Sequence, residues 1–357
     1  MARTQINKAT ERHLGVLKAR RAKLMREVEE RAIRASSKSG ADDGYSVKKT
    51  GDATVVLIGL PSVGKSTILN KVTNARSKVG AYDFTTLTCV PGLMEYRGAK
   101  IQILDLPGII AGAAQGKGIG KRVLTVARNA DLILIVLDVF NPGVKPLLLH
   151  ELHEIGIRPD KQPPNIVIEK TPTGGVSIIT QVPLTKMKKE TIIDMLSVYG
   201  YHNARVMIRE DIDDEQLLDV LLGNRHYMPT MSVLNKIDML SPPELRKMIQ
   251  SLDYPVVPIS ADTDVGIAEF KEALYQELAF IRVYLKPKGG VTDFKEPLII
   301  RSGSSVGTVL DSLHRGLRNQ FRYAQVWGKS VRFGGQKVGL AHQLRDEDVL
   351  TYVTNRA

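Results

Sequence analysis

The sequence predicts an α/β fold in which a parallel β-sheet is combined with further, smaller domains. Apolar, β-rich runs at 54–60, 101–106 and 132–140 alternate with segments of helical character, and this order is typical of parallel sheets with crossover helices. At 357 residues, the chain is too long for one ordinary core and indicates two or three domains of roughly 100 to 200 residues each.

Composition places the chain among globular proteins. Hydrophobic residues make up 43% and charged residues 25%, unlike disordered or fibrous chains. No apolar run approaches the roughly 20 residues of a membrane helix, and MARTQINKATERH lacks the apolar stretch of a secretion signal. One cysteine, Cys89, and seven scattered histidines offer neither a disulfide nor a zinc-ligand spacing. We expect a cytoplasmic protein that has no membrane partner and acts as a monomer.

The net charge of +12 is concentrated at the two ends of the chain. Residues 1–40 hold eleven Lys or Arg against four Glu, which gives +7, and residues 285–357 hold twelve against six, which gives +6. The 244 residues between them therefore sum to 12 − 7 − 6 = −1. Separated basic ends favour a polyphosphate partner such as RNA, and the alternative is that they are solvated helix faces.

The N-terminal region, 1–50, is predicted to be helical and basic. Residues 5–38 contain no proline and one glycine, and Leu14, Leu17, Leu24 and Val28 recur at helical spacing, which indicates a helix or a helical hairpin with one apolar face. The stretch 36–51 is rich in small and polar residues and is typical of a linker.

The next domain, 51–284, is predicted to be interrupted. Nearly a hundred residues separate Asp138 from Asn235, whereas one βαβ crossover needs only about thirty. The inserted piece, 163–227, begins with the β-like runs NIVIEK and VSIITQ, joined by the turn-forming TPTGG, and is interpreted as an α+β subdomain. An apolar stripe then predicts a helix from Gly266 to Tyr284. A Pro/Gly-rich joint follows, and a compact α+β domain should occupy 285–357.

A phosphate-binding loop is predicted at Gly59–Ser66, which fits G-x-x-x-x-G-K-[ST] between a strand and a helix. Backbone N–H groups of such a loop surround phosphate oxygens, Lys65 reaches the β- and γ-phosphates, and the Ser66 hydroxyl ligates Mg²⁺. The residues expected to contact the nucleotide here are Gly59, Leu60, Pro61, Ser62, Val63, Gly64, Lys65, Ser66 and Thr67.

Two further segments are predicted to sense the γ-phosphate. Asp105 ends a strand, where its carboxylate can hold a Mg²⁺-bound water, and the N–H of Gly108 can bond the γ-phosphate. In Phe84–Thr88 a threonine hydroxyl can complete the metal shell while γ-phosphate is present. The nucleotide contacts expected after the strand are Asp105, Leu106, Pro107, Gly108 and Ile109.

The base is predicted to be guanine. Asp238, in Asn235-Lys236-Ile237-Asp238, can accept hydrogen bonds from the guanine N1–H and 2-amino groups, which adenine lacks. Lys236 would lie against the ring, and the N–H of Ala261, in Ser260-Ala261, would contact O6. All five elements occur in order, each at the carboxyl end of a predicted strand, and together they predict GTP binding.

At GLPSVGKST, YDFTTLTCVPG, DLPGIIAGAAQGKGIG and NKID, and over essentially its whole length, the sequence resembles the developmentally regulated GTP-binding (DRG) proteins of the Obg branch of translation-factor-class GTPases. The resemblance implies a P-loop GTPase domain with a helical N-terminal region, an insert resembling part of a ribosomal protein, and a C-terminal ubiquitin-like (β-grasp) TGS domain. It also implies ribosome association and a role in translation. An accessory regulatory protein is a further candidate partner.

The resemblance also implies roles for particular residues. It makes Thr86, the second threonine of the FTT motif, a magnesium ligand together with Ser66. The residues expected to act in catalysis are Lys65, Thr86, Asp105 and Gly108. The glycine-rich stretch 108–120 suits a segment that reorders with nucleotide state.

One departure from the pattern of Ras-like enzymes affects the expected rate of GTP hydrolysis. Ile109 stands where Ras-like enzymes place the glutamine that orients the attacking water, so intrinsic hydrolysis should be slow. Related enzymes without this glutamine use K⁺, held partly by a phosphate-loop asparagine, but Ser62 occupies that position here. The alternative is a group supplied in trans by a ribosomal partner.

Two other functions compete with that of a GTPase switch. One is an RNA- or ribosome-binding scaffold in which GTP is mainly structural. The other is an ATPase of the Obg-like kind, against which the intact Asn235–Asp238 motif argues.

Overall fold

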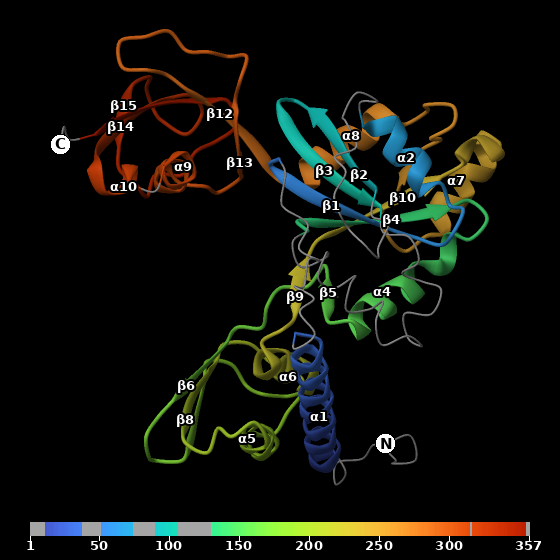
Figure 1. Cartoon of the computed structure of the whole chain (residues 1–357), viewed down its shortest axis with the longest axis vertical. Helices are drawn as coiled ribbons and strands as arrows, with labels where there is room; N and C mark the ends of the chain where they lie inside the picture. The colour runs from blue at the N-terminus through green and yellow to red at the C-terminus, as the bar shows by residue number, and fades with distance from the viewer. Residues whose placement is uncertain (1–10, 38–50, 74–89, 106–129, 315, 355–357) are drawn as a thin grey trace. The chain divides into compact units, whose positions relative to one another are not determined.

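The structure is a computed structural model that describes residues 11–37, 51–73, 90–105, 130–314 and 316–354. The chain divides into two compact units (Figure 1). One comprises Met1–Tyr45 with Leu152–Met228, and the other comprises Ser46–Glu151 with Pro229–Ala357. Within the described residues, no helix is long and apolar enough to cross a membrane.

The larger unit contains the predicted parallel sheet, which is confirmed. The strands lie in the order β11-β10-β4-β1-β3-β2, and all neighbours are parallel except the antiparallel pair β2–β3. Both β1 and β4 are buried along their whole length, which is why their sequences are continuous apolar runs. The strands are β1 (Ala53–Ile58), β2 (Val90–Tyr96), β3 (Ala99–Asp105), β4 (Leu132–Asp138), β10 (Thr230–Asn235) and β11 (Val257–Pro258).

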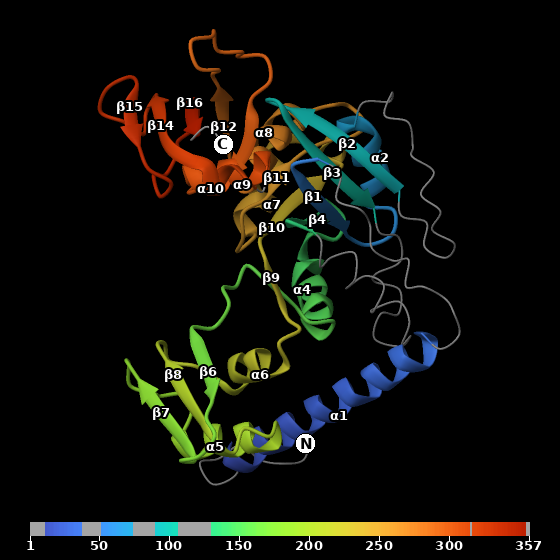
Figure 2. The same cartoon turned by 60° about the vertical axis from the view of Figure 1, so that its left-hand side comes forward.

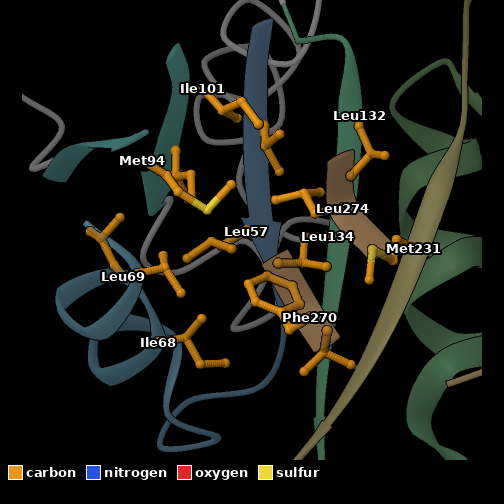
Figure 3. Close-up of a cluster of buried hydrophobic side chains, with 14 of the residues drawn as sticks. Leu57, Ile68, Leu69, Met94, Ile101, Leu132, Leu134, Met231, Phe270 and Leu274 are labelled. Atoms are coloured by element: carbon orange, nitrogen blue, oxygen red, sulfur yellow. The ribbon is translucent and has the colours of Figure 1, made fainter. Parts of the chain in front are cut away.

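Helices enclose the core of this sheet. Ile68 and Leu69 of α2 and Phe270 and Leu274 of α8 pack with side chains of the sheet such as Leu57 (Figure 3). The helical elements of this part are α2 (Lys65–Val72), η1 (Pro142–Val144), α4 (Lys145–Glu154), η2 (Ile237–Met239), α7 (Pro242–Ser251) and α8 (Ile267–Glu277).

The helix predicted to extend to Tyr284 ends earlier. Helix α8 stops at Glu277, Ala279 adopts a left-handed φ of 52°, and strand β12 (Phe280–Leu285) begins directly afterwards. The prediction was wrong at this end because the buried Ile281 falls by coincidence on the helical stripe. The predicted boundary at 285 therefore lies within a strand of the C-terminal domain.

The C-terminal domain has the predicted β-grasp fold. Its strands lie in the order β13-β12-β16-β14-β15, with β12 parallel to β16 at the centre and the other pairs antiparallel. Val309 and Leu310 of α9 pack against one face of this sheet. The remaining elements are β13 (Leu298–Arg301), α9 (Val306–Leu313), α10 (Leu317–Gln320), β14 (Phe321–Trp327), β15 (Gln336–Val338) and β16 (Asp348–Thr354).

The smaller unit contains the predicted α+β insert. Although TPTGG joins β6 and β7 directly, β8 lies between them, antiparallel to β6 and parallel to β7. A parallel pair flanks these strands: β5 lies just before the predicted start of the insert at 163, and β9 lies at its end. The elements are β5 (Ile157–Pro159), β6 (Ile166–Lys170), β7 (Val176–Thr180), α5 (Lys189–Val198), β8 (Ala204–Ile208), α6 (Asp214–Leu222) and β9 (His226–Met228).

The N-terminal region contributes a single long helix, α1 (Glu11–Ser37), which lies along α5 and α6 of the insert (Figure 2). Ala19 is fully buried in the core that the two share, and a Cβ on Gly15 would meet Thr191 Cγ2 at 3.0 Å. Leu24, which the apolar stripe included, is 61% exposed. Gly15 and Ala19 therefore lie close against the insert, whereas Leu24 of the predicted stripe is largely exposed.

A buried carboxylate joins α6 to the β5–β9 pair. Arg158 Nε and Nη2 each donate to Asp219 at 2.6 Å, Arg225 Nε donates at 3.2 Å, and the Tyr227 hydroxyl donates at 3.0 Å. Burial and the Asp219 charge raise the pKa of Tyr227, which keeps this hydroxyl a donor. Because both partners of the Arg158–Asp219 pair are buried, we assign it a structural role.

Candidate functional site

The phosphate loop runs from the buried strand β1 to helix α2, as its sequence predicts. Ser62 and Gly64 adopt left-handed conformations, with φ of 63° and 95°. A Cβ on Gly59 would lie 2.4 Å from the carbonyl oxygen of Val136, and one on Gly64 would lie 2.3 Å from Asn235 Nδ2. Both glycines are therefore required by the close approach of neighbouring segments.

Lys65 lies folded against this loop. Its Nζ donates to the carbonyl oxygens of Gly59 and Leu60 at 3.1 and 2.8 Å. Burial lowers the pKa of the Lys65 ammonium below its ordinary value, and the nearby Asp105 carboxylate opposes that shift. The cation is thus held beside the N-terminal end of α2, where an anion is also favoured.

Ser66 and Asp105 form a pair of oxygen donors. The Ser66 hydroxyl donates to Asp105 Oδ2 at 2.7 Å. Asp105 is 4% exposed, and its Oδ1 atom is buried without a hydrogen-bond partner among the described residues. A hydroxyl and a carboxylate with a free lone pair are the hard oxygen ligands that Mg²⁺ prefers, so these residues fit a magnesium ion or its water shell.

Asn235 connects two of the predicted nucleotide loops. Its Nδ2 donates to the carbonyl oxygen of Val63 at 2.9 Å, and its Oδ1 accepts from the Ala261 N–H at 3.1 Å. The side chain is buried, so both ends of its amide are satisfied within the protein. The N–H of Ala261, which sequence reasoning assigns to guanine O6, is engaged by Asn235 in this structure.

Lys236 has a partner that sequence reasoning missed. Its Nζ lies 2.9 Å from Asp138 Oδ2 and 5.4 Å from the centre of the Phe140 ring. Asp138 is buried, and its Oδ1 also accepts from the N–H of Asn141. The signal was present, because Asp138 ends strand β4 and pairs in register with Asn235 at the end of β10. Adjacent parallel strands place such residues side by side.

The residues expected to read the base lie at the same edge of the sheet. Asp238 is exposed on η2, with no hydrogen bond to any other described residue. Ser260 is buried, and its Oγ accepts from the N–H of Thr263 at 3.2 Å. Register pairs β10 with β11, so the segments that follow these two strands are neighbours.

Part of the predicted site falls outside the described residues. These predictions concern Thr86 within Phe84–Thr88, the residues Leu106, Pro107, Gly108 and Ile109, and the glycine-rich stretch 108–120.

The chain matches three family models. Residues 54–170 match one described as "50S ribosome-binding GTPase", residues 173–280 match the C-terminal region of the same domain, and residues 281–354 match the TGS domain.

Full-length relatives are also found. An uncharacterized GTP-binding protein of Methanocaldococcus jannaschii is 48% identical over 100% of this chain and 90% of its own length. The human developmentally-regulated GTP-binding protein 2 is 45% identical over 99% of this chain and 96% of its own length. The chain belongs to the developmentally regulated GTP-binding protein family.

A solved structure, the YchF GTPase of Schizosaccharomyces pombe, covers 86% of this DRG-family chain and 99% of its own length, at 14% identity and a TM-score of 0.44.

Membership of the DRG family identifies the chain as a GTP-binding protein and, in general terms, a GTP-hydrolysing enzyme. The loop at 59–66 is accordingly the P-loop of its GTPase domain, and the C-terminal β-grasp domain is its TGS domain. Among the described residues predicted to form the nucleotide site, the P-loop, Asp105, Asn235, Lys236 and Ala261 lie together at the carboxyl edge of one sheet.

Proposed function

We propose that this chain is a ribosome-associated switch of the cytoplasm that slowly hydrolyses GTP to GDP and phosphate, with a role in translation. The observation that carries the switch is the Ser66–Asp105 pair, because it joins the P-loop to the end of β3 at 2.7 Å. The chain continues from Asp105 into the segment expected to sense the γ-phosphate. A change at the nucleotide would therefore reach that segment through one side chain.

The described residues have distinct roles in this proposal. Lys65 exchanges its loop carbonyls for the β- and γ-phosphate oxygens, since a charged acceptor makes the stronger hydrogen bond. Ser66 and Asp105 would hold Mg²⁺ directly or through water, with Thr86 as a further ligand. When bound, the ion neutralises charge on the phosphate oxygens. We assign the γ-phosphate contact to Gly108.

Base selection is assigned to the other end of the site. Asp238 is free to accept from the two guanine donors, because no described residue occupies its carboxylate. Asp138 holds Lys236 in place through its buried carboxylate, which restrains the lysine for packing against the base. Asn235 keeps the P-loop and the Ser260–Ala261 segment at a constant separation.

Slow turnover follows from Ile109, which cannot orient the attacking water. Two sources of the missing group are compatible with the sequence: K⁺, for which Ser62 replaces the expected asparagine, or a group provided by the ribosome. The basic ends of the chain and the ribosome-binding description of the matched family support association with ribosomal RNA.

Hydrolysis of GTP by the full chain tests this proposal. Phosphate release would be measured in Na⁺ or K⁺ buffer, with and without ribosomes, for the wild type, Lys65→Ala and a matched control, Lys71→Ala. Lys71 lies on the same helix but forms an exposed ion pair with Asp264. We expect ribosomes to stimulate release, Lys65→Ala to abolish it and Lys71→Ala to leave it unchanged.

Other outcomes separate the alternatives. Stimulation of phosphate release by K⁺ alone would indicate that a monovalent ion, rather than a group supplied in trans by the ribosome, assists hydrolysis. No release above the Lys65→Ala level, together with retained ribosome binding, would favour a scaffold in which GTP is structural. A scaffold gains support from α1, because this basic helix is anchored in a shared core rather than being a loose tail.

A further inference from the structure

The first two strands of the TGS sheet belong to two hydrophobic cores at once. In β12, Phe280 packs in the core of the GTPase domain, whereas the next residue, Ile281, packs with α9 in the TGS core. In β13, Ile299 packs against the GTPase core and Ile300 lies in the TGS core. Successive side chains of a strand point to opposite faces, so each strand presents one face to each domain. Helix α8 ends at Glu277 and β12 begins at 280, so the two domains are joined without an extended linker.

The turn of the β2–β3 hairpin lies against these shared strands. Tyr96 and Ala99 pair at the end of the hairpin, and the two residues between them, Arg97 and Gly98, have φ of 49° and 85°. A Cβ on Gly98 would lie 2.7 Å from Cγ of Pro297, the residue before β13. The backbone of the turn and the start of β13 are therefore in close contact.

Arg97 is an unusual residue for this turn. Two-residue hairpin turns with positive φ at both positions favour asparagine or aspartate, followed by glycine. The Nη2 atom of Arg97 lies 3.0 Å from a carboxylate oxygen of Glu272 on α8, and its guanidinium lies 5.7 and 5.8 Å from the ring centres of Tyr96 and Tyr275. The Tyr96 hydroxyl also donates to Glu272 at 2.7 Å. These contacts account for an arginine in a left-handed conformation and attach the turn to α8.

A row of aromatic rings continues from this turn into the TGS sheet. The ring centres of Tyr96 and Tyr275 lie 5.9 Å apart, and those of Tyr275 and Phe280 lie 5.7 Å apart, both in the edge-on arrangement that aromatic pairs favour. Tyr275 and Phe280 are buried. The packed rings thus connect β2, through α8, to the first residue of β12.

An ion pair makes a second connection between the domains. Arg301, at the end of β13, donates to Asp131 Oδ1 at 2.6 Å. Asp131 directly precedes β4, and its Oδ2 accepts from the N–H of Thr54 in β1 at 2.8 Å. The TGS domain is therefore held at the starts of two central strands as well as at the hairpin turn. We call the contacts of Arg97, Gly98 and Asp131 with Tyr275, Pro297 and Arg301 the junction.

The same hairpin reaches the nucleotide site at its other end. Strand β3 runs from Ala99 at the turn to Asp105, which accepts from Ser66 of the P-loop at 2.7 Å. It pairs along its whole length with β2 and over most of it with β1, and its ends are about 20 Å apart. A displacement of Asp105 would therefore reach the turn as a movement of a whole paired strand.

We propose that the junction couples the nucleotide state of the GTPase domain to the packing of the TGS domain, with the β2–β3 hairpin as the connecting element. The proposal rests on the GTP-dependent switch proposed above and adds its route to the C-terminal domain. Such coupling is reciprocal, so a partner that binds the TGS domain also changes the relative affinity for GTP and GDP.

Hydrogen exchange of the full chain tests this coupling. Exchange of the backbone amides in β12 and β13 would be measured with GDP bound and with a non-hydrolysable GTP analogue bound. We expect the exchange rates of these amides in the wild type to differ at least about fivefold between the two nucleotides, because the contacts of the junction open to different extents. Titration with both nucleotides would give the ratio of their affinities.

Two variants weaken the junction from different sides. Arg97→Asn removes the contacts with α8 but keeps a residue that the turn favours, and Arg301→Ala removes the ion pair with Asp131. Each should reduce the nucleotide-dependent difference in exchange at least about threefold and shift the ratio of the two affinities. Arg318→Ala, which removes an exposed ion pair with Asp311 inside the TGS domain, is the matched control and should change neither. Thermal unfolding would show that each variant remains folded.

The outcomes separate this proposal from the proposed function. A difference in exchange that persists in Arg97→Asn and Arg301→Ala, or that is lost equally in Arg318→Ala, would refute the junction as the route. Equal exchange with both nucleotides in the wild type, with ribosomes still stimulating phosphate release, would refute the coupling and leave the GTPase switch intact. Equal exchange throughout the chain, with no release above the Lys65→Ala level, would refute the switch itself.

Discussion

At the scale of single residues, Asn235 shows how one side chain organises this GTPase domain. It is buried, and its amide links the carbonyl oxygen of Val63 to the N–H of Ala261. Removing a buried side chain that satisfies two backbone groups leaves both groups without partners in a place that water reaches poorly. The residue therefore affects both folding and the relative placement of two nucleotide loops.

We predict that Asn235→Ala lowers the free energy of unfolding by about 2–4 kcal/mol, as two buried backbone groups lose their partners. Affinity for GTP should fall as well, since the loops are no longer joined. Urea denaturation and titration with a fluorescent GTP analogue would measure the two effects. Asn203→Ala is the control, because Asn203 makes one exposed bond to the N–H of Gly175. Equal effects of the two substitutions would contradict the bridging role.

Asp238 has the opposite character, since it is exposed and ready for a ligand. We predict that Asp238→Asn weakens GTP binding by roughly tenfold or more, because an amide cannot accept both guanine donors. Xanthosine triphosphate should gain affinity, since its C2 carbonyl accepts from the new amide. Competition titration with both nucleotides is the measurement, and Asp264→Asn, at an exposed position paired with Lys71, is the control. Unchanged affinities for both nucleotides would refute this model of base recognition.

At the scale of elements, helix α1 is held by small residues and by hydrogen bonds from basic ones. Ala19 packs in the core of the insert, and Lys23 and Arg26 donate to the last carbonyl oxygens of α5 and α6 at 2.8 and 2.9 Å. Cations at helix C-termini are favoured by the helix dipole. The basic composition of α1 therefore serves packing as well as solvation.

Substitutions on two faces of α1 test this arrangement. Ala19→Leu should destabilise the smaller unit by about 1–3 kcal/mol, because the added atoms have no room against α5. Leu24→Ala should change stability by no more than about 0.5 kcal/mol, since Leu24 is exposed. Urea denaturation, with proteolysis of residues 163–227 as a second readout, would measure both. A larger effect of Leu24→Ala would instead support the leucine stripe that the sequence predicts.

At the scale of the whole molecule, the distribution of positive charge indicates which kind of partner the chain favours. The chain carries +12, mostly in its first 40 and last 73 residues, and a partner rich in phosphate gains from releasing its counterions. Arg20 and Arg21 of α1 are exposed and therefore available to such a partner. The TGS domain contains the second basic region.

We predict that Arg20→Gln combined with Arg21→Gln weakens ribosome association and reduces the dependence of log K on log salt by about 1–2 units, because each phosphate contact contributes nearly one. Co-sedimentation with ribosomes between low and moderate KCl would measure this slope. Stability should not change, since neither side chain is buried. Identical slopes for wild type and variant would show that this face of α1 does not contact RNA.

Local sequence patterns were sufficient to predict the core of the GTPase domain. The strands at 54–60, 101–106 and 132–140, the P-loop and Asn235-Lys236-Ile237-Asp238 were all recognisable, because motif spacing and apolar runs are encoded over short stretches of chain. Family resemblance added the TGS domain, whose β-grasp topology the structure confirms. The roles of the individual site residues in nucleotide binding remain predictions.

Contacts between distant segments were decided by tertiary structure. Sequence reasoning placed Asp138 at a strand end but not beside Lys236, since only strand order and register bring them together. It separated α1 from the insert, although the two share a core, and it extended α8 through Ile281, where pairing with β13 favours a strand. The sequence by itself determined which short segments can bind a nucleotide. Tertiary structure decided which residues meet, because register, burial and long-range pairing depend on the whole chain rather than on local propensity.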